Sequence, residues 1–155
     1  MSSANKLSRL YPQNPVCAVG AIIFKQDSVL LVQRSKAPAL GKWSIPGGAV
    51  HLGESLEDAV VREVQEETEL TVCPKRIGKV IDRIFRDADG RVQYHFVIVD
   101  YLCKVLEGEP QPRSDAAAVG YFKLSALDKL DLTEGTAEVI REVYRSQCGQ
   151  PAPGP

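Results

Sequence analysis

Residues 47–70 place a run of acidic side chains directly behind two consecutive glycines, and this stretch constrains the chain more than any other. It reads GGAVHLGESLEDAVVREVQEETEL. Glu63, Glu66 and Glu67 are spaced i, i+3 and i+4, so on a helix the three carboxylates lie along one stripe. Like charges in this arrangement repel by roughly 0.2–0.5 kcal/mol per pair. A divalent cation is the natural group to offset that repulsion, so the stretch predicts a helix with a metal-binding face.

Residues 56–68 carry the other marks of an amphipathic helix. Ser55 is a favourable N-cap, and Asp58 stands three residues later, where a capping box has its acidic partner. A separate apolar stripe is formed by Leu56, Val60 and Val64. The helix is therefore expected to pack against the core on one side and to present its glutamates on another.

The remaining segments alternate between strand patterns and turn patterns. Apolar, β-branched runs predict strands at residues 16–24, 29–34, 77–85, 92–104 and 119–124. Turn residues at 26–28 and 87–90 join the first four strands into two hairpins. Trp43 is expected to anchor in the core ahead of the glycines. The other expectations are a long loop at 106–118, a helical turn from Ser125 and a closing helix at 133–146.

Length and composition indicate one globular domain. A chain of 155 residues with 44% hydrophobic and 25% charged residues is ordinary for a folded protein. We expect a domain at residues 15–147, an N-terminal arm at 1–14 and a flexible, proline-rich tail at 148–155. No apolar run is long enough to cross a membrane.

Charge and cysteine usage narrow the environment and the partners. A net charge of −1 gives no electrostatic footprint for a nucleic-acid polymer. The cysteines have no CxxC spacing and no histidine cluster near them, which is typical of free thiols in a reducing compartment; they are Cys17, Cys73, Cys103 and Cys148. We therefore expect a cytoplasmic protein with a small-molecule partner.

The acidic stretch resembles the signature of the Nudix hydrolases. That signature is a glycine, five residues, a glutamate, seven residues, and then Arg-Glu-apolar-x-Glu-Glu-x-Gly-apolar. The matching residues are Gly48, Glu54, Arg62, Glu63, Val64, Glu66, Glu67 and Leu70. The resemblance covers residues 15–146 and implies an α/β fold: the Nudix α/β/α sandwich, with a mixed β-sheet between helices. Many members dimerise, so a homodimer is compatible with the resemblance, but no apolar patch in the sequence identifies an interface.

The resemblance also implies roles for individual residues. Glu63, Glu66 and Glu67 would bind Mg²⁺ (or Mn²⁺), with support from Glu54 and a backbone carbonyl at the glycine pair, assigned to Gly48. These oxygen ligands suit a hard cation that also binds phosphates. Glu63 and Glu66 would then be catalytic as well, and Arg62 would orient a glutamate of the same site through a charge-assisted hydrogen bond.

One position departs from the family pattern. The glycine near the end of the signature is Glu69 here. A glycine just past a helix end often adopts a left-handed conformation, which costs a glutamate on the order of 1 kcal/mol. Either Glu69 accepts that cost or the helix ends differently. We expect a Glu69→Gly variant to be active and no less stable.

The signature does not identify the substrate, so residues outside it must. The chain is similar to small bacterial ADP-ribose pyrophosphatases around residues 81–85, 94–101 and 114–116, although a proline that often marks ADP-ribose enzymes is replaced by Arg86. Cleavage of a nucleoside diphosphate derivative, with ADP-ribose as the leading guess, is the favoured function. The alternatives are a nucleoside triphosphate pyrophosphatase that removes damaged nucleotides and a non-catalytic, nucleotide-binding sensor module.

Several residues outside the signature are candidates for the site, each with a plainer alternative. Asp115 is a candidate general base, or simply a turn former. Arg34 is a candidate phosphate ligand, or a solvated strand end. Candidates to hold a base or ribose, or else ordinary strand residues, are Arg83, Phe85 and Tyr94. His51 and His95 have no partner pattern and are expected to be structural.

Overall fold

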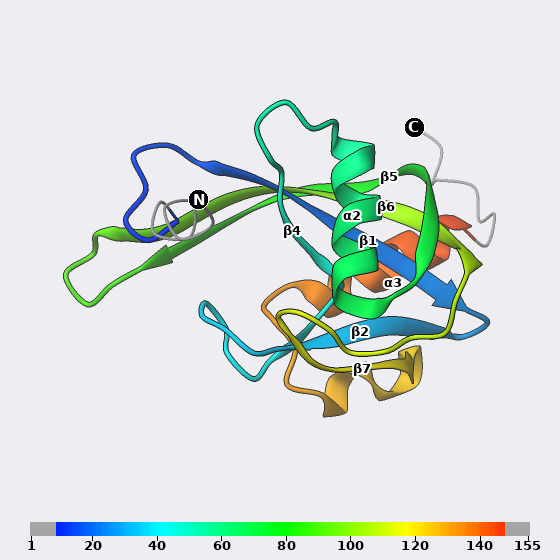
Figure 1. The fold of residues 1–155 in the computed structure, drawn as a ribbon. Helices are drawn as coiled ribbons and strands as arrows, with labels where there is room; N and C mark the ends of the chain where they lie inside the picture. The colour runs from blue at the N-terminus through cyan, green and yellow to red at the C-terminus, as the bar shows by residue number, and fades with distance from the viewer. Residues whose placement is uncertain (1–8, 148–155) are drawn as a thin grey trace, which may run out of the picture.

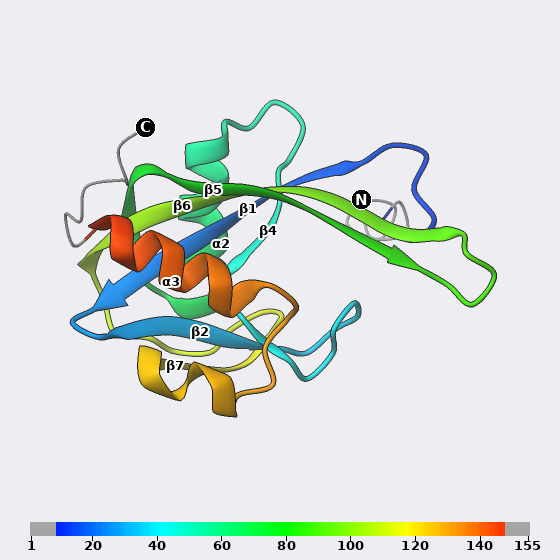
Figure 2. The same cartoon turned by 180° about the vertical axis from the view of Figure 1, so that it is seen from behind.

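The structure is a computed structural model that describes residues 9–147. Its core is a mixed sheet with a helix on each side (Figures 1 and 2). The strands lie in the order β3-β2-β1-β6-β5, with β4 paired to β1 and β7 paired to β2. Helix α2 (Leu56–Thr68) covers one face and α3 (Thr136–Gln147) the other. The predicted α/β sandwich is confirmed.

The strands have the following bounds: β1 Val16–Lys25, β2 Ser28–Arg34, β3 Trp43–Ser44, β4 Gly47–Ala49, β5 Thr71–Arg86, β6 Val92–Glu107 and β7 Ala116–Lys123. A 3₁₀ helix, η1 (Leu124–Lys129), forms where a helical turn was expected. The β1–β6 pair is parallel, and the other strand pairs are antiparallel. The parallel pair makes the sheet mixed, as predicted.

Several predicted boundaries were wrong. The strand expected from residue 77 begins at Thr71, because β6 continues to Glu107 and Thr71 pairs with it. The predicted loop at 106–118 is shorter at both ends for the same reason, since β7 begins at Ala116 and pairs with β2. Long-range pairing thus extended strands beyond their apolar runs. The closing helix also starts later than expected, at Thr136, after Gly135 at φ 76°.

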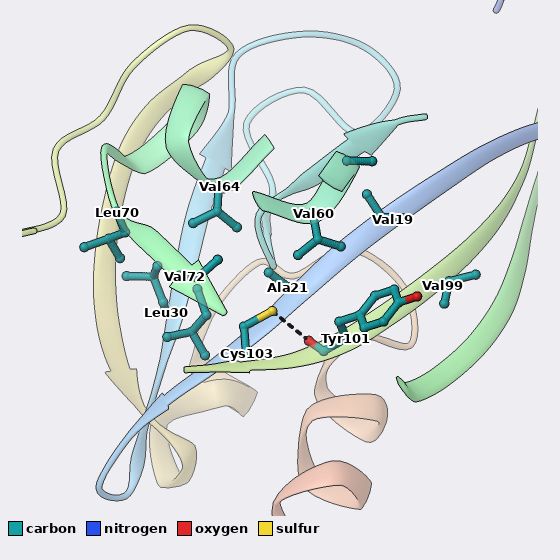
Figure 3. Close-up of a cluster of buried hydrophobic side chains, with 12 residues drawn as sticks. Val19, Ala21, Leu30, Val60, Val64, Leu70, Val72, Val99, Tyr101 and Cys103 are labelled. Carbon is teal, nitrogen blue, oxygen red and sulfur yellow. Dashed lines mark hydrogen bonds between the residues drawn. The ribbon is translucent and has the colours of Figure 1, made fainter. Parts of the chain in front are cut away.

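Side-chain alternation along the central strands creates two cores. On β1, Val19, Ala21 and Ile23 face α2, whereas Ile22 faces α3. Figure 3 shows the α2-side core, in which Val60 and Val64 of the helix meet Tyr101 and Cys103 of β6. The α3-side core is built around buried residues of α3, namely Val139, Ile140 and Val143. The predicted apolar face of α2 is confirmed, although Leu56 is only half-buried.

The β5–β6 hairpin is long and projects past both helices (Figures 1 and 2). The described part of the N-terminal arm lies on it: the Tyr11 backbone N–H donates to the Gln93 carbonyl (2.8 Å), and its hydroxyl donates to Asp87 (2.8 Å). Cys17, Cys73 and Cys103 are free thiols, as expected. Cys148 and the predicted tail lie outside the described residues. No helix between residues 9 and 147 is long and apolar enough to span a membrane.

Candidate active site

Helix α2 is fixed at both ends and along its buried face. Ser55 caps the first turn, accepting a hydrogen bond from the Asp58 backbone N–H at 3.1 Å. Ala59, Val60 and Val64 are fully buried against the sheet. The helix bounds match the prediction. With the apolar face fixed in this way, the acidic stripe is directed toward β4, where the two glycines lie.

Arg62 connects the acidic residues of the signature. Its Nε and Nη2 donate to the two carboxylate oxygens of Glu54 at 2.7 and 2.9 Å. Its Nη1 donates to Glu63 at 2.8 Å and to Glu66 at 3.2 Å. Nη2 also donates to the Ala49 carbonyl of β4 at 3.0 Å. One planar guanidinium therefore orients three glutamates and attaches them to the glycine strand.

The two glycines of β4 lie against two carboxylates of the helix, those of Glu63 and Glu67. A Cβ on Gly48 would lie 2.5 Å from the Glu63 carboxylate, so only glycine fits there without a shift. The Gly47 backbone N–H donates to Glu67 Oε1 at 3.4 Å. Glu67 is only 8% exposed, although it is ionisable. Glu63 and Glu67 thus lie side by side beneath the glycine backbone.

The acidic groups of the site have opposite pKa shifts. Hydrogen bonds from Arg62 lower the pKa of Glu54 to about 2. Burial raises the pKa of Glu63 despite its contact with Arg62. Burial, and then the adjacent Glu63 carboxylate, raise the pKa of Glu67. Glu54 is therefore held as a carboxylate, whereas Glu63 and Glu67 lack the positive charge that would stabilise both in ionised form.

This shortage of positive charge fits a divalent cation. The donors are all oxygens, and the carboxylates of Glu63 and Glu67 cannot both ionise cheaply without a cation between them. Within residues 9–147, no three acidic, histidine or cysteine side chains converge as a finished metal site in this conformation. Arg62 holds Glu54 and Glu63 toward itself. A bound cation would have to compete with it for those oxygens.

Arg34 lies close enough to Glu67 and to Asp115 for both of their charges to act on it. Burial lowers the pKa of Arg34, and the charges of Glu67 and Asp115 oppose that shift. The Arg34 Nε donates to the Pro38 carbonyl at 2.8 Å. The Asp115 carboxylate forms an ion pair with Lys36 at 2.6 Å. The structure therefore brings these two predicted site residues toward the acidic helix.

The other three predicted substrate residues lie on the opposite face of the sheet. Arg83 and Phe85 lie two and four residues beyond Ile81, a residue of the α3-side core, and so share its face of the sheet; Tyr94 pairs with Phe85 on the neighbouring strand. Phe85 and Tyr94 pack edge to face at 6.1 Å. The Arg83 guanidinium lies against Gly135, just before α3. The structure thus separates these residues from the glutamates by the thickness of the sheet.

Glu69, the glutamate that replaces the family glycine, has a left-handed backbone conformation. Glu69 is the C-cap of α2 with φ 65°, so the chain keeps the glycine-type helix end. Its carboxylate forms an ion pair with Arg113. The Arg113 backbone N–H donates to the Glu67 carbonyl at 3.0 Å, and that of Gln111 donates to the Thr68 carbonyl at 2.9 Å. The loop that carries Asp115 is therefore attached to the end of the acidic helix.

The sequence did not identify Lys36, Arg113 or Asp100 as residues of interest. Asp100 alone had a local signal, because it is the single charged residue in the apolar run from Phe96 to Cys103. Trp43 packs edge to face on Phe122 at 4.8 Å, in line with the anchor expected there. His51 is exposed and His95 half-buried. A hollow of about 470 Å³ beside Lys25, Lys75 and Lys104 is lined by none of the predicted site residues.

Comparison with known proteins agrees with this geometry. A family model described as the NUDIX domain matches residues 15–143. The chain belongs to the Nudix hydrolase family and is a hydrolase of the pyrophosphatase type. Members of this family generally need a divalent metal ion.

Within the family, the chain is similar in sequence to proteins with more than one named activity. The chain is 38% identical to an ADP-ribose pyrophosphatase of Methanocaldococcus jannaschii, over 93% of this chain and 81% of that one. It is 31% identical to a putative 8-oxo-dGTP diphosphatase 2 of Mycobacterium tuberculosis, over 90% and 94%. The crystal structure of an ADP-ribose pyrophosphatase from Streptococcus suis superposes with a TM-score of 0.69 at 32% identity, covering 88% of this chain and 95% of that one.

Proposed function

We propose that this chain is a Mg²⁺-dependent (or Mn²⁺-dependent) pyrophosphohydrolase that cleaves ADP-ribose into AMP and ribose 5-phosphate. The observation that carries the proposal is the pairing of Glu63 with Glu67 beneath Gly47 and Gly48, with too little positive charge to balance them. The name of the 38% identical relative supports ADP-ribose as the substrate.

The residues that would hold the cation are Glu63, Glu66 and Glu67, with Glu54 and the Gly48 carbonyl beside them. A bound divalent cation would offset the charge of the diphosphate and lower the pKa of the attacking water. Arg62 keeps the glutamates in position through its contacts to three of them. Gly48 keeps the backbone free of a side chain, so that phosphate oxygens can approach closely.

Asp115 is the general base in this proposal, and Arg34 binds a phosphate oxygen. Water oxygen forms a bond to phosphorus, and its proton passes to the Asp115 carboxylate. The bridging P–O bond breaks, and its electron pair leaves with the departing phosphate. The placement of Arg34 within electrostatic reach of both Glu67 and Asp115 supports these roles.

Hydrolysis of a nucleoside triphosphate is the second candidate. It is favoured by the 31% identical relative whose name gives it as a putative 8-oxo-dGTP diphosphatase. Both reactions need the same cation and the same attack on phosphorus, so the acidic helix does not separate them. The separation must come from residues that contact the nucleoside.

A substrate panel tests the proposal. Purified enzyme with Mg²⁺ or Mn²⁺ is given ADP-ribose, dGTP, 8-oxo-dGTP and diadenosine polyphosphates, and the products are identified by ion-exchange chromatography. We expect ADP-ribose to give AMP with the highest kcat/KM. A higher kcat/KM for a triphosphate would transfer the assignment to the second candidate. If no compound turns over with any divalent ion, the chain is a nucleotide-binding module rather than an enzyme.

A further inference from the structure

Asp100 is a buried carboxyl group whose Oδ1 has no hydrogen-bond partner among residues 9–147. It lies in the middle of β6, it is 2% exposed, and its Oδ1 accepts no hydrogen bond within the described chain. An unsatisfied buried polar group destabilises a fold, so such groups are rare unless function retains them. A hydrophobic residue would suit this position in the sheet better.

The surroundings of Asp100 are built to accommodate it. It pairs with Gly20 of β1, and a Cβ on Gly20 would overlap Oδ1 and approach Ile45. Gly20 therefore leaves room for the carboxyl group. Gly20 also pairs with Gly47 of β4, whose backbone N–H reaches Glu67. Asp100 is thus only one strand removed from the glycines of the acidic site.

Arg83 stands on the same face of the β5–β6 hairpin. Asp100 pairs with Lys79 and Phe96 pairs with Arg83, so Asp100 and Arg83 are two residue pairs apart, with Ile98 between them. The charge of Arg83 acts on Asp100, but no residue of the described part of the chain donates a hydrogen bond to Asp100 Oδ1. The face therefore presents a hydrogen-bond acceptor and a cationic donor, separated by apolar side chains.

We propose that Asp100 determines substrate specificity by accepting a hydrogen bond from the nucleoside half of the substrate. The donor is an O–H or N–H group, supplied by a ribose hydroxyl or by the amino group of adenine. This inference rests on the proposed function, because it places the nucleoside on the α3-side face while the diphosphate passes over β4, the edge strand that carries Gly47 and Gly48. Because Asp100 is covered in this conformation, the side chains above it have to move aside when the donor binds.

A buried, unpaired acceptor discriminates strongly between a ligand that carries the donor and an analogue that lacks it. A buried acceptor that pairs only with the correct ligand is left unpaired by an analogue that lacks the donor, and the analogue is rejected. A carboxyl group retained only for folding would be hydrogen-bonded in the free protein. The two roles therefore predict opposite effects of replacement on stability.

The test compares Asp100→Asn and Asp100→Ala with wild type. Asp82→Asn is the matched control, because Asp82 is an exposed aspartate on the same hairpin. Isothermal titration calorimetry measures the Kd of ADP-ribose in EDTA, where no turnover occurs, and thermal unfolding gives the Tm. We expect Asp100→Ala to raise Kd by roughly ten- to hundredfold, Asp100→Asn to keep the wild-type Tm or exceed it, and the control to match wild type in both.

Two analogues identify the donor. One analogue lacks a hydroxyl group on the ribose of the adenosine half. The other carries hypoxanthine in place of adenine and so lacks the amino group. Wild type should bind one of them as weakly as Asp100→Ala binds ADP-ribose, and the variant should not distinguish that analogue from ADP-ribose. Unchanged Kd in both variants, or a lower Tm for Asp100→Asn with unchanged Kd, would overturn the inference. If wild type fails to hydrolyse ADP-ribose yet binds it through Asp100, the proposed function fails and the inference stands.

Discussion

Two carboxyl groups of this protein, Glu54 and Asp100, lie in opposite electrostatic settings. Glu54 receives two hydrogen bonds from Arg62 and one from the His51 backbone, and its pKa falls to about 2. In the described part of the chain nothing donates a hydrogen bond to Asp100 Oδ1, and burial raises the pKa of Asp100 to about 6. Because Glu54 already has its partners, it serves to organise the site. Asp100 retains its capacity to accept a hydrogen bond from a ligand.

The comparison extends to the two faces of the sheet. On the α2 side, one guanidinium connects several glutamates, and excess negative charge calls for a cation. On the α3 side, Asp100 and Arg83 stand apart among apolar and aromatic side chains. The first arrangement suits a diphosphate bound through metal, and the second suits the uncharged part of a nucleotide. Four measurements test this contrast.

The largest effect is expected from Glu67→Gln, the residue at the centre of the charge excess. Removing a carboxylate that would hold the cation should lower kcat/KM by on the order of a hundredfold to a thousandfold, comparable to losing a main transition-state contact. Glu57→Gln, on the exposed side of the same helix, is the control and should retain activity. Steady-state kinetics with Mg²⁺ measures both. Undiminished turnover in Glu67→Gln would show that the metal assignment is wrong.

The next effect concerns the pH dependence of stability at Asp100. Its pKa is raised from 3.8 to about 6 in the folded state, so folding favours the protonated form. The stability it contributes is present at low pH and is lost as pH rises through about 6. Relative to Asp100→Asn, wild type should lose up to about 3 kcal/mol of unfolding free energy between about pH 4 and about pH 7.

Urea unfolding of wild type and Asp100→Asn across that pH range measures the difference. Taking the difference removes the contribution of other titrating groups common to both proteins. A constant difference at all pH values would mean that Asp100 has an ordinary pKa and a partner that the structure does not show.

A smaller effect is expected from Arg62→Lys. The lysine keeps the positive charge but cannot make the planar, forked contacts to Glu54, Glu63 and Glu66. Loss of these supporting contacts should reduce kcat/KM by about ten- to hundredfold, and metal titration should show weaker Mg²⁺ binding. Arg91→Lys, an exposed arginine paired with Asp87, is a suitable control. Equal activity of Arg62→Lys and wild type would mean that charge alone is sufficient.

The smallest effect is expected from Glu69→Gly. Glycine removes the left-handed strain of about 1 kcal/mol, but it also removes the exposed ion pair with Arg113, which contributes at most about 1 kcal/mol. The variant should therefore be active and no less stable than wild type, as its urea midpoint will show. A double-mutant cycle with Arg113→Ala isolates the ion pair. A clear loss of stability in Glu69→Gly would mean that the Arg113 contact outweighs the strain.

Local features of this protein could be predicted because local rules specify them. Ser55, the apolar stripe and the acidic stripe together define helix α2, and its bounds were predicted correctly. Strand ends were less predictable, because Thr71 becomes part of β5 only through its pairing with Glu107. A periodic pattern specifies which side of an element is apolar, but it does not specify how far a partner strand extends.

The sequence alone determined the family, the acidic helix and its glycine entrance, since the spacing of Gly48, Glu54 and Glu63 is a property of the chain. Which charged side chains form ion pairs depends on the folded structure. Asp115 meets Lys36, and Arg113 meets Glu69, across long stretches of sequence. Among the described residues, Asp100 Oδ1 remains unpaired because Gly20, eighty residues earlier, offers it space and no donor. The ion pairs and hydrogen bonds of a carboxyl group decide its charge state, and those between residues distant in the sequence exist only in the folded chain.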